Sequence, residues 1–108
     1  MSTSPTQLTL KKWREAGYNA AVVERWNPHS KTRQDLFGFV DVLCVGHGTT
    51  VAIQTTSYGN VSARVRKIED MPEIVGSIRD AGWRVIVEGW HQPKGKGTRW
   101  KCREVDIS

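Results

Sequence analysis

Apolar and polar positions along this chain form a pattern that predicts one helix at the start, followed by strands and a second helical region. The first helix is expected over residues 5–16, because Ser4 suits an N-cap, Pro5 suits the first helical position and Gly17 favours a stop. Runs rich in Val, Ile and aromatic residues, bounded by polar or glycine-containing turns, predict strands. These runs lie at residues 18–26, 38–45, 50–56, 83–90 and 98–107.

Residues 57–81 change to helical spacing, with Val61, Val65 and Ile68 on one face. Pro72 should kink or restart this helix, because proline cannot continue the hydrogen-bond ladder. The predicted order is therefore α-β-β-β-α-β-β, which favours an α/β fold with a mixed sheet flanked by helices. The 108 residues fit a single domain over residues 1–108.

Charge changes the picture, because the chain carries a formal net charge of +5 and has a pI near 9.6. A basic single domain that also contains five Trp residues favours a polyanionic partner such as nucleic acid. The alternative is a solvated basic surface with no such role. The candidate nucleic-acid-binding residues gather in two segments, and they are Arg64, Arg66, Lys94, Lys96 and Arg99.

Two polar residues interrupt the apolar strands of "FGFVDVLCVGHGTTVAIQTTS". If Gly46 to Thr49 form a four-residue loop, Val45 faces Thr50, and counting back places Asp41 opposite Gln54. Opposed residues point to the same face with Cβ atoms about 4.5–5.5 Å apart. Two oxygen-bearing side chains at that separation could share one hard cation such as Mg²⁺.

The other face of this predicted strand pair is uniformly apolar and should pack on a helix. It carries Val42, Cys44, Val51 and Ile53.

The strand order and these polar positions resemble the PD-(D/E)xK nuclease superfamily, and most closely its Holliday-junction resolvase and VRR-NUC branches. In that superfamily an Asp begins the second core strand, and a Glu or Gln, one residue and a Lys follow on the third. Asp41 in "GFVDVL" and Gln54 in "AIQTTS" match the first two positions. The resemblance implies a restriction-endonuclease-like fold and Mg²⁺- or Mn²⁺-dependent hydrolysis of DNA, with Asp41 and Gln54 as metal ligands.

The third position departs from the family pattern, because Thr56 stands where the lysine is expected. A threonine cannot supply the positive charge, and in some branches the lysine is carried by the following helix. Lys67 is predicted to take that catalytic role, with Arg64 as a phosphate clamp one turn away. Both could instead be solvated basic residues.

Two further carboxylates are predicted to complete the metal shell. Asp35 lies six residues before Asp41 in "RQDLFGFVD", and Glu24 lies in the preceding strand. The alternatives are a turn cap for Asp35 and a local ion pair for Glu24. The predicted metal ligands are thus Asp41, Gln54, Asp35 and Glu24.

The sequence therefore predicts a metal-dependent DNA endonuclease, with branched DNA such as Holliday junctions among its candidate substrates. The alternative is a catalytically inactive DNA-binding module on the same fold, and a protein-interaction domain is a third. Because two strands of a junction must be cut together, a homodimer is expected. Since there is no long apolar run and no Cys-x-x-Cys pair, we expect a cytoplasmic protein without a membrane segment.

Overall fold

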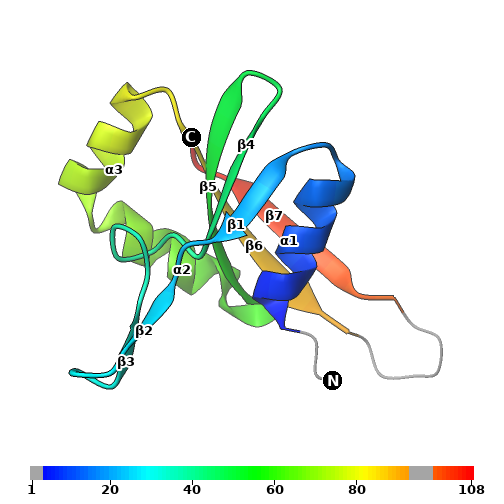
Figure 1. Ribbon diagram of the computed structural model, residues 1–108, viewed down its shortest axis with the longest axis horizontal. Helices are drawn as coiled ribbons and strands as arrows, with labels where there is room; N and C mark the ends of the chain where they lie inside the picture. Colours follow the sequence, from blue (N-terminus) through cyan, green and yellow to red (C-terminus); the bar gives the residue numbers. More distant parts are fainter. Residues whose placement is uncertain (1–3, 93–98) are drawn as a thin grey trace.

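A five-stranded mixed sheet forms the middle layer of the structure, a computed structural model that describes residues 4–92 and 99–108 (Figure 1). The strand order is β1-β4-β5-β6-β7, and only the β5–β6 pair is parallel. The strands are β1 (Asn19–Val22), β4 (Val42–Gly46), β5 (Thr49–Ser57), β6 (Arg84–His91) and β7 (Lys101–Asp106). The fold is therefore of the mixed α/β class, as predicted.

Helix α1 (Pro5–Glu15) covers one face of the sheet, and its limits follow the predicted signals. The Ser4 side chain accepts a hydrogen bond from Gln7 N at 3.2 Å, and Gly17 adopts the left-handed φ of +94° just after the helix. Beneath α1, Leu10 and Trp13 form a buried cluster with sheet residues. Those residues include the predicted apolar face, Val42, Cys44, Val51 and Ile53. The packing of that face on a helix is confirmed.

The opposite face is covered by the crossover that the parallel β5–β6 pair requires. It consists of a short 3-10 turn (Tyr58–Asn60), α2 (Val61–Glu69) and α3 (Pro72–Asp80). A new helix, α3, begins at Pro72, as predicted. The helix before it, α2, begins at Val61 and not at residue 57, because Ser57 still belongs to β5. The apolar stripes of both helices pack on the sheet residues of this face, and the buried members include Val61, Ile68, Val75, Ile78, Ala52, Val85 and Val87.

The predicted strand at residues 18–26 is divided in the structure. After β1, the chain leaves the main sheet and forms a separate hairpin of β2 (Arg25–Asn27) and β3 (Thr32–Gln34). We call residues 25–34 the arm, and Figure 1 shows it projecting away from the sheet. The Asn27 side chain stabilises the turn between β2 and β3 by accepting hydrogen bonds from His29 N and Ser30 N at 2.9 and 3.3 Å.

The strand predicted at residues 38–45 begins only at Val42, because a tight loop precedes it. In this loop Leu36 bridges to Val40, and Phe37 and Gly38 adopt left-handed φ values of +57° and +86°. The β4–β5 turn contains two residues, rather than the predicted four, because Gly46 pairs with Thr49. The register is nevertheless as predicted.

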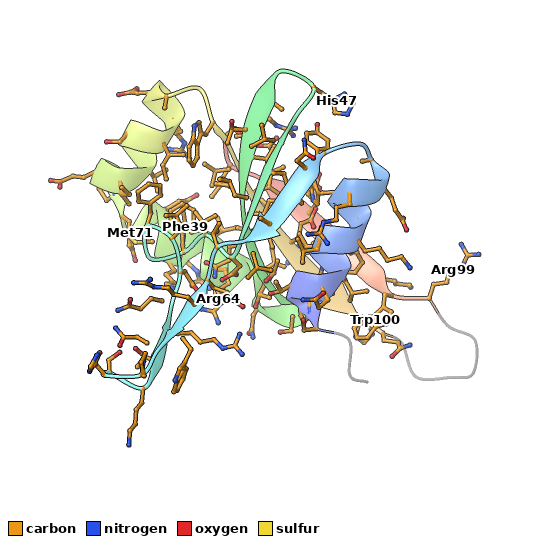
Figure 2. The ribbon with its side chains drawn as sticks, viewed as in Figure 1. Phe39, His47, Arg64, Met71, Arg99 and Trp100 are labelled. Atoms are coloured by element: carbon orange, nitrogen blue, oxygen red, sulfur yellow. The ribbon has the colours of Figure 1, made fainter. Side chains whose placement is uncertain are left out.

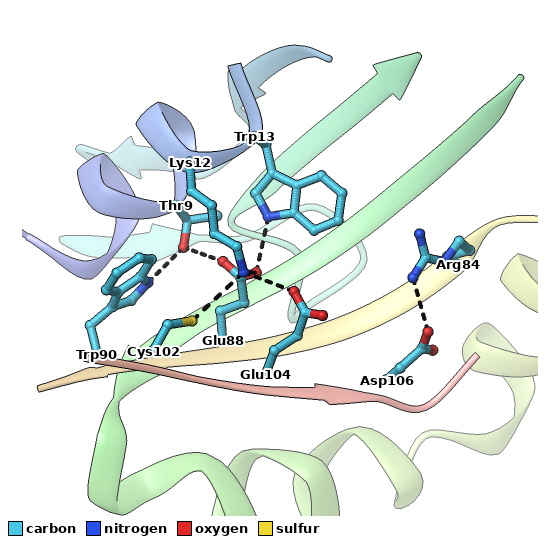
Figure 3. Close-up of polar contacts among 9 residues, drawn as sticks. All are labelled: Thr9, Lys12, Trp13, Arg84, Glu88, Trp90, Cys102, Glu104 and Asp106. Carbon is cyan, nitrogen blue, oxygen red and sulfur yellow. Dashed lines mark hydrogen bonds and ion pairs between the residues drawn. The ribbon is translucent and has the colours of Figure 1, made fainter. Parts of the chain in front are cut away.

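A buried polar cluster joins α1 to the sheet (Figure 3). Glu88 of β6 is fully buried, and it accepts hydrogen bonds from Thr9 Oγ1, Lys12 Nζ and Trp13 Nε1 at 2.9, 2.6 and 3.0 Å. Lys12 also reaches Glu104 of β7 at 2.9 Å. This cluster fixes the position of α1 over the sheet.

None of the helices within the described residues has the length and apolar character that a membrane span requires.

Candidate metal centre

Asp41 occupies the point where three chain segments meet. Its backbone N–H donates to Ile53 O at 2.9 Å, and its carbonyl accepts from Val23 N at 2.9 Å. The paired part of β4 and β5 ends at Val42 opposite Ile53, so Asp41 lies just beyond the ladder. The predicted register, which counts back to Asp41 beside Gln54, is confirmed.

Three donors converge on one oxygen of the Asp41 carboxylate. Asp41 Oδ2 accepts from Thr55 N at 2.8 Å, from Thr55 Oγ1 at 3.2 Å and, at the long distance of 3.4 Å, from Gln54 Nε2. Thr55 Oγ1 also lies 2.8 Å from Thr6 Oγ1 in the first turn of α1. Asp41 is thereby held in place by β5, and β5 is tied to α1.

Two more carboxylates join Asp41, and local backbone structure explains how. The Leu36–Val40 bridge places Asp35 and Asp41 one step outside the paired residues, so the tight loop brings their side chains together. Glu24 follows Val23, which is bonded to the Asp41 carbonyl. One oxygen of each of Glu24, Asp35 and Asp41 lies within 4.8 Å of the others. The sequence-predicted carboxylates therefore form one cluster.

The cluster lies in an open pocket of about 340 Å³ between the start of α1, the ends of the strands and α2. Its walls include all four predicted metal ligands. The remaining lining residues are Pro5, Thr6, Arg33, Thr55 and Arg64.

The electrostatics of this pocket favour a cation. Burial raises the pKa of the Asp41 carboxyl to about 7, and the neighbouring Asp35 carboxylate adds to the rise, whereas the hydrogen bond from Thr55 N opposes it. Arg33 Nη1 lies 2.9 Å from Glu24 Oε1, so one carboxylate is already paired. The cluster thus concentrates negative charge that a divalent ion would neutralise.

Gln54 provides a second sign of a missing partner. Its side chain is only 3% exposed, and its Oε1 atom is buried without a hydrogen-bond donor among the described residues. A buried acceptor with no partner costs about 1–3 kcal/mol. A hard cation prefers oxygen ligands of this kind. The residues present therefore fit a Mg²⁺- or Mn²⁺-type site.

The two predicted cationic residues of α2 differ in their relation to the pocket. Arg64, half-buried on α2 and labelled in Figure 2, is one of the lining residues. Lys67 is exposed and does not line the pocket. Thr56, at the position where the nuclease resemblance predicts a lysine, is buried. The catalytic role of Lys67 stays a prediction, and Arg64 is the better-placed cation.

Of the other predicted nucleic-acid-binding residues, Arg66 and Arg99 do not line the pocket. Arg66 is exposed on α2, and Arg99 is exposed just before β7, near the right edge of the view in Figure 2, whereas Arg64 lies near its middle. Lys94 and Lys96 lie outside the described residues. Their roles stay predictions.

Sequence reasoning missed the side chains of three polar residues in the pocket wall: Thr6, Arg33 and Thr55. Thr6 and Thr55 gave no signal, because their contact joins a helix and a strand 49 residues apart. Arg33 had a detectable signal, since it stands two residues before Asp35 in a continuous polar segment.

No protein-family model, curated protein or solved structure matches this chain. Function is therefore inferred from the geometry of the pocket and from the resemblance of its residues to a nuclease motif.

Proposed function

We propose that the chain is a divalent-metal-dependent DNA endonuclease with a restriction-endonuclease-like fold, and that its site is the pocket around Asp41. The position of Asp41 at the start of the second strand of the main sheet, and of Gln54 on the third, supports the resemblance to PD-(D/E)xK nucleases. The crossover helix after β5 agrees with it as well. Branched DNA such as a Holliday junction is the substrate that the resemblance favours.

One observation carries the proposal: three carboxylates from separate segments converge beside a buried amide oxygen that has no partner. Exposed acidic groups meet by chance on many surfaces, but here Asp41 is buried, and its second oxygen is fixed by backbone and side-chain donors. Holding a carboxylate in this way preorganises a ligand before the cation arrives.

The roles of the residues follow from their positions. Asp41, Asp35, Glu24 and Gln54 would hold Mg²⁺ or Mn²⁺, which supplies Lewis-acid chemistry to phosphodiester hydrolysis. Thr55 orients Asp41 through its N–H and hydroxyl groups. Arg64, on the pocket wall, would bind a phosphate oxygen and offset the negative charge that develops on it. Lys67 would contribute only after a change of side-chain position.

A second function is favoured by a specific observation. Thr56 replaces the lysine of the family motif and is buried. A catalytically inactive DNA-binding module on the same fold would retain the basic surface without needing that lysine. The net charge of +5 supports DNA as the partner under either function.

Cleavage assays separate these functions. Supercoiled plasmid and a synthetic four-way junction would be incubated with the protein in Mg²⁺, in Mn²⁺ and in EDTA, alongside the Asp41→Asn variant. We expect cutting in metal that disappears both in EDTA and in the variant. Asn keeps an oxygen that can accept the Thr55 N–H, so the fold should persist, and circular dichroism checks this. If Asp41→Asn cut DNA at the wild-type rate, the nuclease site could not lie in this pocket. If the wild type bound DNA without cutting it, the inactive module would be favoured.

A cytoplasmic location is proposed from the sequence. A homodimer is the assembly that the resolvase resemblance favours, because paired strands of a junction are cut by paired sites. Light scattering coupled to size exclusion, with and without junction DNA, would determine the mass. A single copy in both conditions would exclude the dimer.

A further inference from the structure

The arm and the start of α1 enclose a second hollow of about 580 Å³ beside the candidate metal centre. Three residues, Thr6, Glu24 and Arg33, line both hollows, so the two meet along a common wall. The hollow of about 580 Å³ is also lined by Trp26 and Arg25, which belong to the arm. A linear ligand bound along the arm would therefore extend directly to the carboxylate cluster.

Trp26 is the unusual member of this wall. Its side chain is 58% exposed, the largest fraction among the exposed large hydrophobic residues of the described chain. Within residues 4–92 and 99–108, no aromatic ring stacks against it. A large apolar ring left in water beside a hollow is available for a contact, because exposure of apolar area is unfavourable.

The register of the arm sets a cation beside this ring. Trp26 pairs directly with Arg33, so the two side chains share one face of the hairpin. Arg33 then reaches Glu24 at the edge of the metal cluster. One face of the arm thus presents, in order, an aromatic ring, a guanidinium group and the carboxylates.

We propose that this groove binds an unpaired nucleic-acid strand, with one base stacked on Trp26 and the adjoining phosphates near Arg33 and Arg25. The inference rests on the proposed nuclease function for its direction, because the stacked nucleotide lies next to the phosphate to be cut. Bases inside a duplex are already stacked, and only an unpaired base presents a free face to the indole ring. The preferred substrate is therefore a strand with unpaired nucleotides at the cutting point, as in a flap, a loop or a branch.

Charge and chemistry favour this partner over a protein. The ring is flanked by arginines, and the whole chain is basic, which suits a polyanion. Aromatic rings interleaved with cations are the usual composition of single-strand binding surfaces. A second copy of the chain seated on Trp26 is the competing occupant, and the experiment below distinguishes it.

The test measures binding of the full chain in EDTA, where no cleavage occurs. Fluorescence anisotropy would give the Kd for labelled oligo(dT), oligo(U) and a hairpin duplex, with wild type, Trp26→Leu and Trp26→Phe. Val45→Ala serves as the matched control, because Val45 is 48% exposed at the β4–β5 hairpin and does not line the groove. Thermal unfolding verifies that each variant is folded.

We expect Trp26→Leu to raise the Kd for the unpaired strands about tenfold or more, which is the effect of losing one stacked base. Trp26→Phe keeps a ring and should lose much less, and Val45→Ala should match wild type. The Kd for the duplex should change less than about twofold in every variant. The tighter of oligo(dT) and oligo(U) then identifies the sugar of the strand.

Three results would overturn the inference. The first is an unchanged Kd for both oligonucleotides in Trp26→Leu, and the second is an equal loss of affinity for duplex and single strand. The third is a wild type that light scattering shows to be dimeric and that Trp26→Leu converts to monomer. Failure of the proposed function has a different signature. If Asp41→Asn has no effect on cleavage but Trp26→Leu loses affinity for oligo(dT), the strand-binding groove is supported and the nuclease site at Asp41 is not.

Discussion

Lys12 Nζ lies 2.6 Å from Glu88 Oε2, and this ion pair links the middle of α1 to a fully buried carboxylate in β6. Burial alone lowers the pKa of Lys12, but its hydrogen bonds to Glu88 and Glu104 outweigh that effect and raise it. Because the first turn of the same helix lines the candidate metal centre, the pair also determines where Thr6 lies. The stability of the core and the geometry of the pocket are therefore connected through α1.

Removing the lysine should destabilise the fold. In Lys12→Met, Glu88 keeps two neutral donors but loses its charged partner, and breaking a buried pair costs about 3–5 kcal/mol. Lys12 is 38% exposed, so solvent screening reduces the expected loss to about 2 kcal/mol. Urea unfolding would measure it, with Lys11→Met as the exposed control on the same helix. An equal loss in the two variants would contradict a special role for the pair.

The same variant should show a characteristic pH dependence. Burial raises the pKa of Glu88, and Lys12 opposes that rise, so Lys12→Met should raise the pKa further. A carboxyl whose pKa is raised on folding contributes stability at low pH, and this contribution is lost as pH increases through the folded-state pKa. The deficit in the free energy of unfolding of Lys12→Met relative to wild type should therefore shrink as the pH is lowered toward the ordinary range of a glutamate pKa. A deficit that grows on acidification would exclude this explanation.

Metal binding should appear as a change in stability, independently of any cleavage. At a free Mn²⁺ concentration of 100 times its Kd, the native state gains about 2.7 kcal/mol. Asp41→Asn should lose this gain, and in EDTA it should be at least as stable as wild type because one crowded carboxylate has been removed. Asp80→Asn, an exposed acid at the end of α3, is the control. Equal Mn²⁺ stabilisation of wild type and Asp41→Asn would place the ion elsewhere.

Arg64 and Lys67 can be separated by kinetics. If Arg64 acts on the phosphate in the pocket, Arg64→Ala should lower kcat about 10²–10³-fold, as loss of a transition-state donor does, with a smaller effect on KM. Lys67→Ala should change both constants by only a small factor, since its side chain is exposed away from the pocket wall. The opposite ranking would restore the lysine to the catalytic role predicted from the sequence.

The remaining basic residues should contribute to affinity through charge alone. If Arg66 and Arg99 each neutralise one phosphate, Arg66→Gln and Arg99→Gln should each reduce the slope of log K against log salt by about 0.9 on duplex DNA. Lys11→Gln is the control, because Lys11 is exposed on α1 and lies 4.0 Å from Glu15. A slope that is unchanged in Arg99→Gln would remove the β7 side of the molecule from the DNA-binding surface.

The sequence was informative where a local signal determines geometry. Ser4, Pro5 and Gly17 specified α1, and the turn between β4 and β5 specified the register that brings Asp41 to Gln54. The predicted four-residue loop is wrong, but the predicted register is correct, because a two-residue turn with Gly46 paired to Thr49 preserves the same partners.

Other features depend on contacts that are distant in the chain. The strands of the arm have three residues each and no apolar alternation, so the polar pattern of "NPHSKTRQD" predicts a loop and not a hairpin. Glu88 lies within an apolar strand, and its partners Thr9, Lys12 and Trp13 are more than 70 residues away. Only the folded arrangement reveals that these groups satisfy one another.

The arm begins directly after Glu24 and ends directly before Asp35, so two members of the carboxylate cluster stand at its base. An ion shared by those two side chains would close the hairpin into a ring and remove conformational entropy from it. Occupancy of the cluster would thereby rigidify a hairpin that makes no strand pairing with the main sheet. Amide hydrogen exchange within residues 25–34 would slow when Mg²⁺ is added, while exchange in β5 and β6 would stay constant. The orientation of Trp26 would then report, at a distance, whether the metal is bound.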